Sequence, residues 1–353
     1  MSTNMRSIDA FRDKGRSLEQ QFRKAVYSGD RIYLPPRLYV LAEPIEFEHA
    51  LLLKGHLGKF YSRDLLQTTE IRAHASLGAR PLFHRRGYYL SHTDVWNTSE
   101  DTTADLGLAA SVGCGLTVQV EDIAFQTTDE NSCIMQVYNA SNPTYVKNCA
   151  FGNAYRGLLM LNVFGGIVEN CTFQGTFRYP WLADTERVKR GWGLCVGNNI
   201  TITQCNWQGG LVGIQAIGTG NTLTGGRIER NIYGMRIGFK NLNPDGQFGS
   251  IWASSYSTFT GFTMESNLFG LDARAGQGTR MSEFCVTGTN APQLDGISDG
   301  PCEYGIKAEY LANTNTLQNC AISGNFRQAP IVGGYTKNTG IIERNGLTPV
   351  RNI

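Results

Sequence analysis

Four charged residues recur at equivalent places of a repeated sequence pattern. Glu229 and Glu265 each directly follow an apolar residue, in the strings RIE and TME. On adjacent strands the two carboxylates would lie about 5 Å apart, and their repulsion would keep a proton on one of them. Glycoside hydrolysis needs one protonated and one ionised carboxyl group, as acid and as nucleophile or base. Arg236 and Asp272 occupy a second pair of equivalent places, in GMRI and GLDA, and complete the set of candidate catalytic residues.

The same residues allow two other interpretations. In a β-elimination, Arg236 would take the proton next to a uronate carboxyl group while carboxylates hold a divalent cation such as calcium. Without that chemistry no cofactor is expected. Outward charges on repeated strands also form ion-pair ladders with no catalytic role. Candidate substrate-binding residues lie near the same places of the pattern, with the two aromatic ones as stacking platforms for sugar rings: Gln208, Gln215, Arg274, Lys307, Trp181 and Tyr233. Tyr233 is equally suited to packing.

Two motifs alternate along residues 120–322. The first reads apolar-any-Asn-Cys-any-apolar and is most complete at Val146–Phe151, Val168–Phe173 and Leu317–Ile322. The second reads Gly-apolar-any-apolar and starts at Gly157, Gly193, Gly213, Gly234, Gly270 and Gly305. Both have period two rather than 3.6, which predicts short strands joined by Gly and Asn turns. A unit of about 22 residues that returns to its own start is one coil of a solenoid.

The alternation also predicts the core. One inward column holds Cys149, Cys171, Cys205 and Cys320, with Ile123 and Phe284 at that place in other coils. A second holds Phe125, Phe151, Phe173, Trp207, Ile228, Met264, Val286 and Ile322. The nine cysteines are therefore expected to be free and buried, and none forms a CxxC pair. The Asn before the Cys, at 148, 170 and 319, is expected in a turn, where its buried amide bonds to its neighbours in the stack.

Composition narrows the function classes. Hydrophobic residues make up 41% of the 353, enough for a core, which excludes a disordered chain. The net charge of +2 predicts neither nucleic-acid binding nor attraction to an anionic membrane. No apolar run is long enough to span a bilayer, and the N-terminus has no apolar signal segment.

The N-terminal part is expected to cap the solenoid, because an end coil would otherwise expose its core and strand edges. Ser17–Tyr27 has apolar residues on one helical stripe, with Ser17 as N-cap. Gly29–Tyr39 (GDRIYLPPRLY) then supplies a strand, a Pro-Pro turn and a second strand.

The helix followed by this string resembles the N-terminal signature of the pectate-lyase-like right-handed parallel β-helix superfamily, in particular its phage tailspike and depolymerase-like branch. The resemblance implies an all-β, right-handed parallel β-helix with an N-terminal capping helix. Two places depart from the signature: residues 13–17 (DKGRS) replace its acidic stretch, and Arg37 replaces a glycine. The superfamily contains lyases, hydrolases, epimerases and inert structural proteins, so the signature specifies fold more than chemistry.

We expect four regions. Residues 1–60 form the cap, continuous with the solenoid, and 61–113 form an irregular, loop-rich region packed on it. Residues 114–335 form the regular coils and 336–353 a C-terminal extension. Two long additions, at Thr176–Arg190 and Thr289–Glu303, fall at the same corner and predict the walls of a cleft. If the four charged residues prove to be only a ladder, the groove beside Gly238–Ser250 is the next candidate site.

These features favour a carbohydrate-binding and carbohydrate-cleaving protein that acts on a bacterial surface polysaccharide. It would be a glycoside hydrolase or a polysaccharide lyase, virion-borne or extracellular. Its expected partners are the polysaccharide, two further copies in a homotrimer and other virion proteins, with no nucleic acid or membrane. The alternative is a non-enzymatic structural or adhesive β-helix of a virion or cell surface.

Overall fold

A capping helix followed by stacked strands forms the first of two units, residues 1–172; the second unit is 173–353. The computed structural model describes residues 5–57, 68–78, 80–85, 116–127, 133–138, 140–152, 156–161, 163–175, 192–196, 199–216, 218–242, 248–252, 254–273, 276–294, 298–308, 316–328, 331–332, 337–339 and 342–344. Helix α1 (Leu18–Tyr27) begins at the predicted N-cap, where Ser17 and Gln20 form a reciprocal capping box. Its apolar face is buried through Phe22, Ala25 and Val26.

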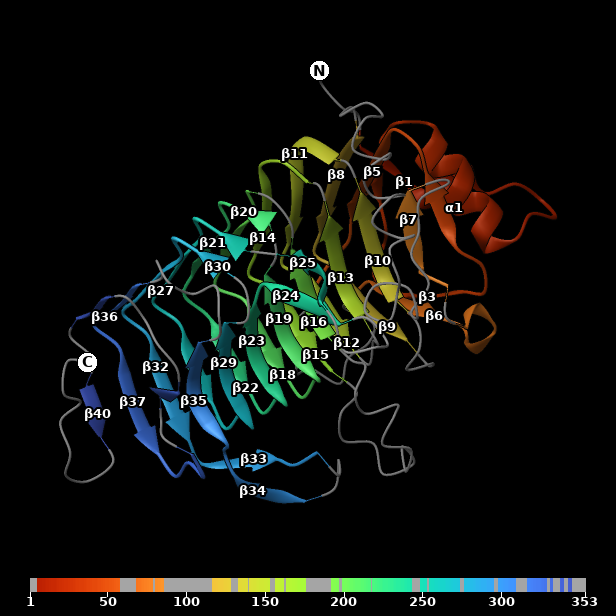
Figure 1. Ribbon diagram of the computed structural model, residues 1–353. Coiled ribbons are helices and arrows are strands. Elements are labelled where there is room, and N and C mark those ends of the chain that lie inside the picture. Colours follow the sequence, from red (N-terminus) through yellow and green to blue (C-terminus); the bar gives the residue numbers. More distant parts are fainter. Residues whose placement is uncertain are drawn as a thin grey trace. The chain divides into compact units, whose positions relative to one another are not determined.

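Three parallel sheets make up the first unit (Figure 1). Sheet A contains β1 (Met5–Ser7), β2 (Arg31–Tyr33), β5 (Ala50–Lys54), β8 (Leu116–Glu121), β11 (Ala140–Lys147) and β14 (Gly166–Glu169). Sheet B contains β3 (Leu38–Leu41), β6 (Glu70–Ala73), β9 (Ala124–Thr127) and β12 (Ala150–Gly152). Sheet C contains β4 (Ile45–Phe47), β7 (Phe83–Arg85), β10 (Cys133–Tyr138) and β13 (Arg156–Leu161). Short 3-10 helices lie at η1 (Ile8–Phe11) and η3 (Ala75–Leu77).

The second unit repeats the three sheets. Sheet A contains β17 (Thr201–Thr203), β21 (Thr222–Thr224), β27 (Thr258–Thr260), β31 (Arg280–Ser282), β36 (Thr316–Gln318) and β39 (Lys337–Thr339). Sheet B contains β15 (Thr172–Gln174), β18 (Asn206–Gln208), β22 (Arg227–Glu229), β28 (Thr263–Glu265), β32 (Cys285–Gly288), β37 (Ala321–Gly324) and β40 (Ile342–Arg344). Sheet C contains β16 (Trp192–Val196), β19 (Val212–Ala216), β23 (Tyr233–Ile237), β29 (Phe269–Ala273), β35 (Tyr304–Ala308) and β38 (Ile331–Val332).

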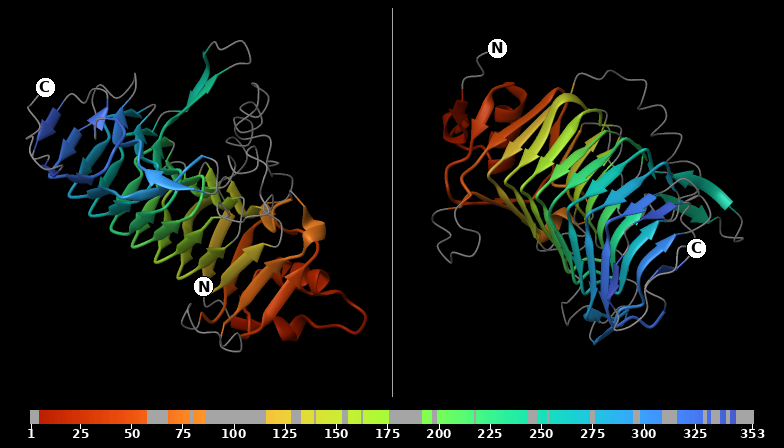
Figure 2. Two further views of the ribbon diagram at one scale, coloured as in Figure 1. Left: turned by 90° about the horizontal axis from the view of Figure 1, so that it is seen from below. Right: turned by 90° about the vertical axis from the view of Figure 1, so that its left-hand side faces the viewer.

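Shorter pairs of strands extend from these coils. A small parallel sheet contains β20 (Gly218–Thr219), β26 (Ser254–Ser255) and β30 (Gly276–Gln277). Two antiparallel hairpins are β24 (Phe239–Leu242) with β25 (Phe248–Trp252), and β33 (Asn290–Pro292) with β34 (Asp299–Pro301). Figure 2 shows the strands of each sheet lying side by side, one from each coil.

Every predicted inward residue of the two columns is buried, with at most 3% of its surface exposed. Within the columns aromatic rings stack, Phe125 on Phe151 at 5.3 Å and Phe173 on Trp207 at 5.8 Å between ring centroids. Of the cysteines whose side chains the structure describes, Cys149, Cys171, Cys205, Cys302 and Cys320 are free and buried. Cys285 is free but exposed, because Phe284 occupies the inward place of its coil. The prediction of interior thiols is therefore wrong for Cys285.

The asparagine turns have a different physical basis from the one expected. Asn148, Asn170 and Asn319 all have φ near +50°, a conformation that Asn tolerates better than most residues. Asn170 donates to Asn148 through its side-chain amide at 2.9 Å, as the predicted ladder requires, but this ladder lies at the surface. The buried asparagine ladder is Asn231 and Asn267, in the turns between sheets B and C.

The predicted boundaries of the four regions stay predictions. Inside 61–113, β6 and β7 pair with coil strands of sheets B and C. Most of the remaining residues of that region, and most of 336–353, lie outside the described residues.

Candidate active site

Sheet B of the second unit carries the predicted carboxylates on its outer surface. Gln208 pairs with Glu229, and Glu229 with Glu265, at equivalent places of β18, β22 and β28. The residue before each of them, Trp207, Ile228 or Met264, is buried, so the period-two alternation turns the polar side chains outward. The side chains of Glu229 and Glu265 are 23% and 42% exposed, which leaves both carboxylates accessible.

One arginine connects the two carboxylates. Arg227 contacts Glu229 through Nε at 3.1 Å and Glu265 through Nη2 at 2.6 Å. The hydrogen bond that Arg227 donates to Glu265 is the main cause of the raised pKa of Arg227. The positive charge of Arg227 offsets the repulsion between Glu229 and Glu265. This repulsion was the reason to expect a proton on one of the two carboxyl groups. Sequence reasoning missed Arg227, although it lies two residues before Glu229 and therefore on the same face of the strand.

One of the two predicted walls adjoins this pair. The hairpin of β33 and β34 falls within Thr289–Glu303. The hydroxyl groups of Ser266 and Thr289 form a short hydrogen bond at the start of this segment. Arg230 binds both carboxylate oxygens of Asp299, at 3.0 and 3.2 Å. Since Arg230 and Ser266 directly follow Glu229 and Glu265, the hairpin is tied to the turns beside the carboxylates.

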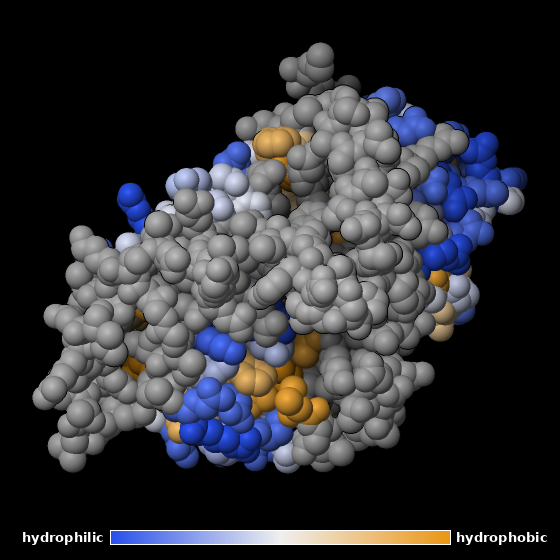
Figure 3. Space-filling view, in the orientation of Figure 1, coloured by the Kyte–Doolittle hydropathy of each residue, from blue (hydrophilic) through white to orange (hydrophobic). Residues whose placement is uncertain are grey.

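The face shown in Figure 3 includes apolar surface next to a hydrophilic area in the region of this hairpin. The other predicted wall, Thr176–Arg190 with Trp181, lies outside the described residues. The predicted cleft between two walls therefore stays a prediction.

A second polar column lies on sheet C of the same unit. Gln215, Arg236, Asp272 and Lys307 occupy equivalent places of β19, β23, β29 and β35. Gln215 and Asp272 are buried, and Gln215 donates to the carbonyl oxygen of Gly238 at 2.9 Å. Arg236 Nε lies 3.9 Å from Asp272 Oδ2, and the arginine keeps 18% of its side chain exposed. Arg236 and Lys307 are thus the partly exposed members, whereas Asp272 and Gln215 are buried. The side chain of Arg274 lies outside the described residues.

Aromatic rings form a ladder beside this column. Tyr233 stacks on Phe269 at 4.7 Å, and Phe269 lies 5.2 Å from Tyr304, between ring centroids. The guanidinium group of Arg236 covers the Tyr233 ring at 3.6 Å. Tyr233 and Phe269 also pack on a buried cluster of Ile232, Leu268, Ala291 and Cys302. Sequence reasoning missed Tyr304, which could have been found as the aromatic residue before the glycine of the second motif.

The structure thus arranges the predicted four-residue patch as two pairs on adjacent sheets. Glu229 and Glu265 form the accessible pair, and Arg236 and Asp272 form the more buried one. Among the described residues no group of three or more His, Cys, Asp or Glu is arranged to hold a metal ion. Within the same part of the chain, no helix is long and apolar enough to cross a membrane.

Comparison with solved structures identifies the fold. The Agl-KA catalytic domain matches 97% of this chain with a TM-score of 0.54 at 14% identity, over 58% of its own length. The enzymatically active domain of bacteriophage CBA120 tailspike protein 4 matches 96% with a TM-score of 0.51 at 13% identity, over 44% of its length. DFA-IIIase from Arthrobacter chlorophenolicus A6 matches 97% with a TM-score of 0.51 at 11% identity, over 88% of its length.

The chain therefore spans little more than half of the first structure and less than half of the second. No protein-family model and no curated protein sequence matches it. The chain has the pectate-lyase-like right-handed parallel β-helix fold with an N-terminal capping helix, as the resemblance implied.

Proposed function

We propose that the protein binds a polysaccharide and cleaves it by glycoside hydrolysis at Glu229 and Glu265. The observation that carries the proposal is the register of β22 with β28, which places two accessible carboxylates side by side. Parallel strands lie about 4.8 Å apart, close to the roughly 5 Å that separates the carboxyl groups of retaining glycosidases.

The contacts of Arg227 assign a role to each carboxyl group. Glu265 makes the shorter contact with Arg227, 2.6 Å, and is the more exposed of the two carboxyl groups, which suits the nucleophile. Glu229 has the longer contact, 3.1 Å, and is the less exposed of the two, which suits the acid. Glu229 would give its proton to the glycosidic oxygen as that bond breaks, while Glu265 bonds to the anomeric carbon. Water activated by Glu229 would then release the sugar and return the proton.

β-Elimination is less well supported by the geometry. It would require Arg236 to accept a proton and nearby carboxylates to hold a divalent cation such as calcium. Asp272, the carboxylate beside Arg236, is completely buried and faces the guanidinium group. A residue in that place positions Arg236 over the Tyr233 ring and cannot itself reach a polymer outside the coil.

The proposed substrate is a bacterial surface polysaccharide, and Arg236 and Lys307 favour a polymer with acidic sugars. We further propose that the protein acts on a virion or outside the cell as a homotrimer, next to other virion proteins. The likeness of the fold to a tailspike domain supports this setting. Sedimentation equilibrium of the purified chain tests the trimer, and a monomer at micromolar concentration would contradict it.

The activity is tested on a panel of capsular and O-antigen polysaccharides, by release of reducing ends and by ultraviolet absorbance of unsaturated uronate. We expect reducing ends without unsaturated product. In the Glu265→Gln variant turnover should fall by about two to four orders of magnitude. The matched control is Glu169→Gln, because Glu169 is 39% exposed and paired with Lys147 at 3.0 Å on a neighbouring coil. Formation of unsaturated product would show that the reaction is an elimination and not a hydrolysis. If both variants were equally active, Glu265 would not be part of the site.

The Arg227 contacts also favour a second candidate, a non-enzymatic structural or adhesive β-helix. In that case Arg227, Glu229 and Glu265 are only an ion-pair ladder that stabilises the outer surface. This candidate predicts no turnover on any polymer of the panel, with slightly lower stability in Glu265→Gln.

A further inference from the structure

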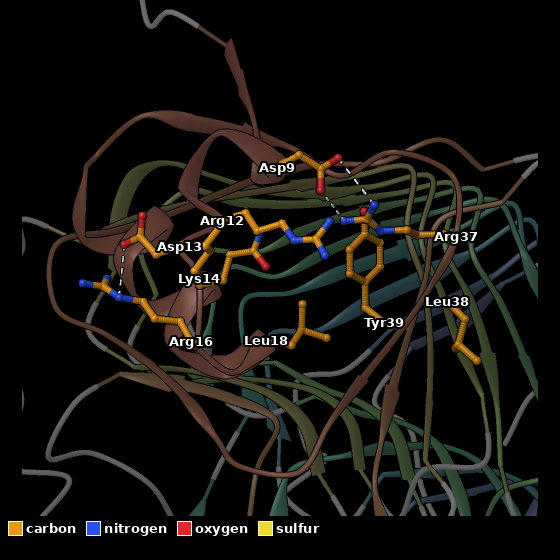
Figure 4. A pocket seen from close by; sticks show the side chains of 11 residues that line it. Asp9, Arg12, Asp13, Lys14, Arg16, Leu18, Arg37, Leu38 and Tyr39 are labelled. Carbon is orange, nitrogen blue, oxygen red and sulfur yellow. Dashed lines mark hydrogen bonds and ion pairs between the residues drawn. The ribbon is translucent and has the colours of Figure 1, made fainter.

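The cap of the first unit contains a pocket of about 720 Å³ with a predominantly cationic lining. Figure 4 shows it between the segment that leads into α1 and the first strand of sheet B. Its charged lining consists of Arg12, Lys14, Arg16, Arg37, Asp9 and Asp13. Four cations and two carboxylates leave an excess of positive charge, in a chain whose total is only +2.

Residues from two separate segments meet in this pocket. The segment before α1 contributes Asp13, Lys14, Gly15 and Arg16 to the lining. Arg37 lines the opposite side, next to Tyr39. Two segments that are distant in the sequence thus bring their positive charges to one cavity.

The two carboxylates of the lining already have partners. Asp9 accepts from both terminal nitrogens of Arg37, at 2.6 and 3.4 Å. Asp13 contacts Arg16 at 3.1 Å and Lys24 at 3.0 Å. The side chains of Arg12 and Lys14 have no ion pair with any residue in the described part of the chain. These two cations are therefore available to a ligand.

The pocket is also held in shape before any ligand arrives. Tyr39 is buried, and its hydroxyl group donates to the carbonyl oxygen of Pro35 at 3.0 Å. The Arg37 guanidinium group lies 4.7 Å from the Tyr39 ring centre. Figure 4 shows the Arg12 side chain crossing the pocket toward Arg37 and Tyr39. Two guanidinium groups that face one cavity repel each other, and an oxyanion between them would remove that repulsion and accept hydrogen bonds from both.

We propose that this pocket binds an oxyanion, the carboxylate, phosphate or sulfate group of a small molecule or of a sugar unit. The contacts would come from Arg12 and Lys14, with the remaining donors of Arg37 opposite. The site lies wholly in the first unit and does not depend on hydrolysis at Glu229 and Glu265.

Isothermal titration of the full chain with inorganic phosphate, sulfate and D-glucuronate tests the proposal, at constant ionic strength set with chloride. Glucose is the neutral control. We expect saturable binding of at least one oxyanion and none of glucose. A preference for glucuronate would indicate a sugar acid, whereas a preference for phosphate or sulfate would indicate an ester group.

Two variants locate the site. Arg12→Gln should weaken binding about ten- to a hundredfold, the loss expected for hydrogen bonds to a charged group. Arg12 is exposed, so this variant should fold normally. The matched control is Arg23→Gln, on α1 but outside the lining, where the arginine pairs with Glu43 at 2.6 Å. No oxyanion binding, unchanged affinity in Arg12→Gln, or an equal loss in Arg23→Gln would overturn the proposal.

Discussion

The buried asparagine ladder of the second unit should contribute far more to stability than the surface ladder. Asn267 donates through Nδ2 to the carbonyl oxygen of Ile228 at 2.9 Å. Its side-chain oxygen accepts from the backbone N–H of Asn231 at 2.9 Å and from the Asn231 amide at 3.1 Å. Asn231 and Asn267 are 1% and 3% exposed, so water cannot replace these bonds. We therefore choose Asn267→Ala as the perturbation.

The magnitude follows from the groups left behind. Removing the amide deprives the buried N–H of Asn231 of its partner, at about 1–3 kcal/mol, and removes the side-chain hydrogen bond to the Ile228 carbonyl group, at about 1 kcal/mol. The free energy of unfolding should fall by about 3–4 kcal/mol once a small cavity is included. Asn267→Asp keeps the shape and the acceptor but loses the donor to Ile228, so it should also be strongly destabilising.

The control is Asn170→Gly in the surface ladder. Glycine adopts the φ of +50° without strain, and the variant loses one exposed hydrogen bond to Asn148. Its cost should stay below about 1 kcal/mol. Urea denaturation followed by far-ultraviolet circular dichroism measures all three variants against the original chain. If Asn267→Ala lay within about 1 kcal/mol of the original chain, or matched Asn170→Gly, the reasoning from burial would be refuted.

Three further outcomes are expected. A thiol reagent at pH 8 should modify Cys285 in the native protein but not Cys320, because burial raises the pKa of the Cys320 thiol to about 12; rapid modification of Cys320 would contradict the register. Gly234→Ala should lower the free energy of unfolding by about 1–3 kcal/mol, because a Cβ there would lie 2.9 Å from the carbonyl oxygen of Gly270. Chemical denaturation measures this change, and an unchanged midpoint would show that the two strands can move apart to accept the Cβ. Burial opposes ionisation of Glu121, but hydrogen bonds from a lysine and a tyrosine outweigh it and lower the pKa of Glu121 below 4.5. The stability that the ionised Glu121 contributes is therefore present above pH 4.5 and is lost as the pH falls through the lowered pKa. Glu121→Gln should cost about 1 kcal/mol at pH 7 and little at pH 3, and a difference that does not depend on pH would contradict the assignment.

The coil register was predictable because, over many repeats, the period-two alternation allows only one set of residues to point into the core. A slip of one residue would have turned Phe151, Trp207 and Met264 to the solvent, whereas all three are buried. The pairing of Glu229 with Glu265 and of Arg236 with Asp272 follows from the same register.

Residue type and spacing alone therefore determined the strands, the core columns, the capping helix and the vertical neighbours of the candidate site. Only the tertiary structure decided how accessible each polar side chain is and which partner it meets across the coil. Asp272 is buried while Glu265 is exposed, although both occupy outward places of the same coil, so the alternation along a strand does not determine burial on the outer surface. The convergence of residues 13–16 with Arg37 on one pocket likewise depends on chain reversal through α1, which brings together charges that no local pattern relates.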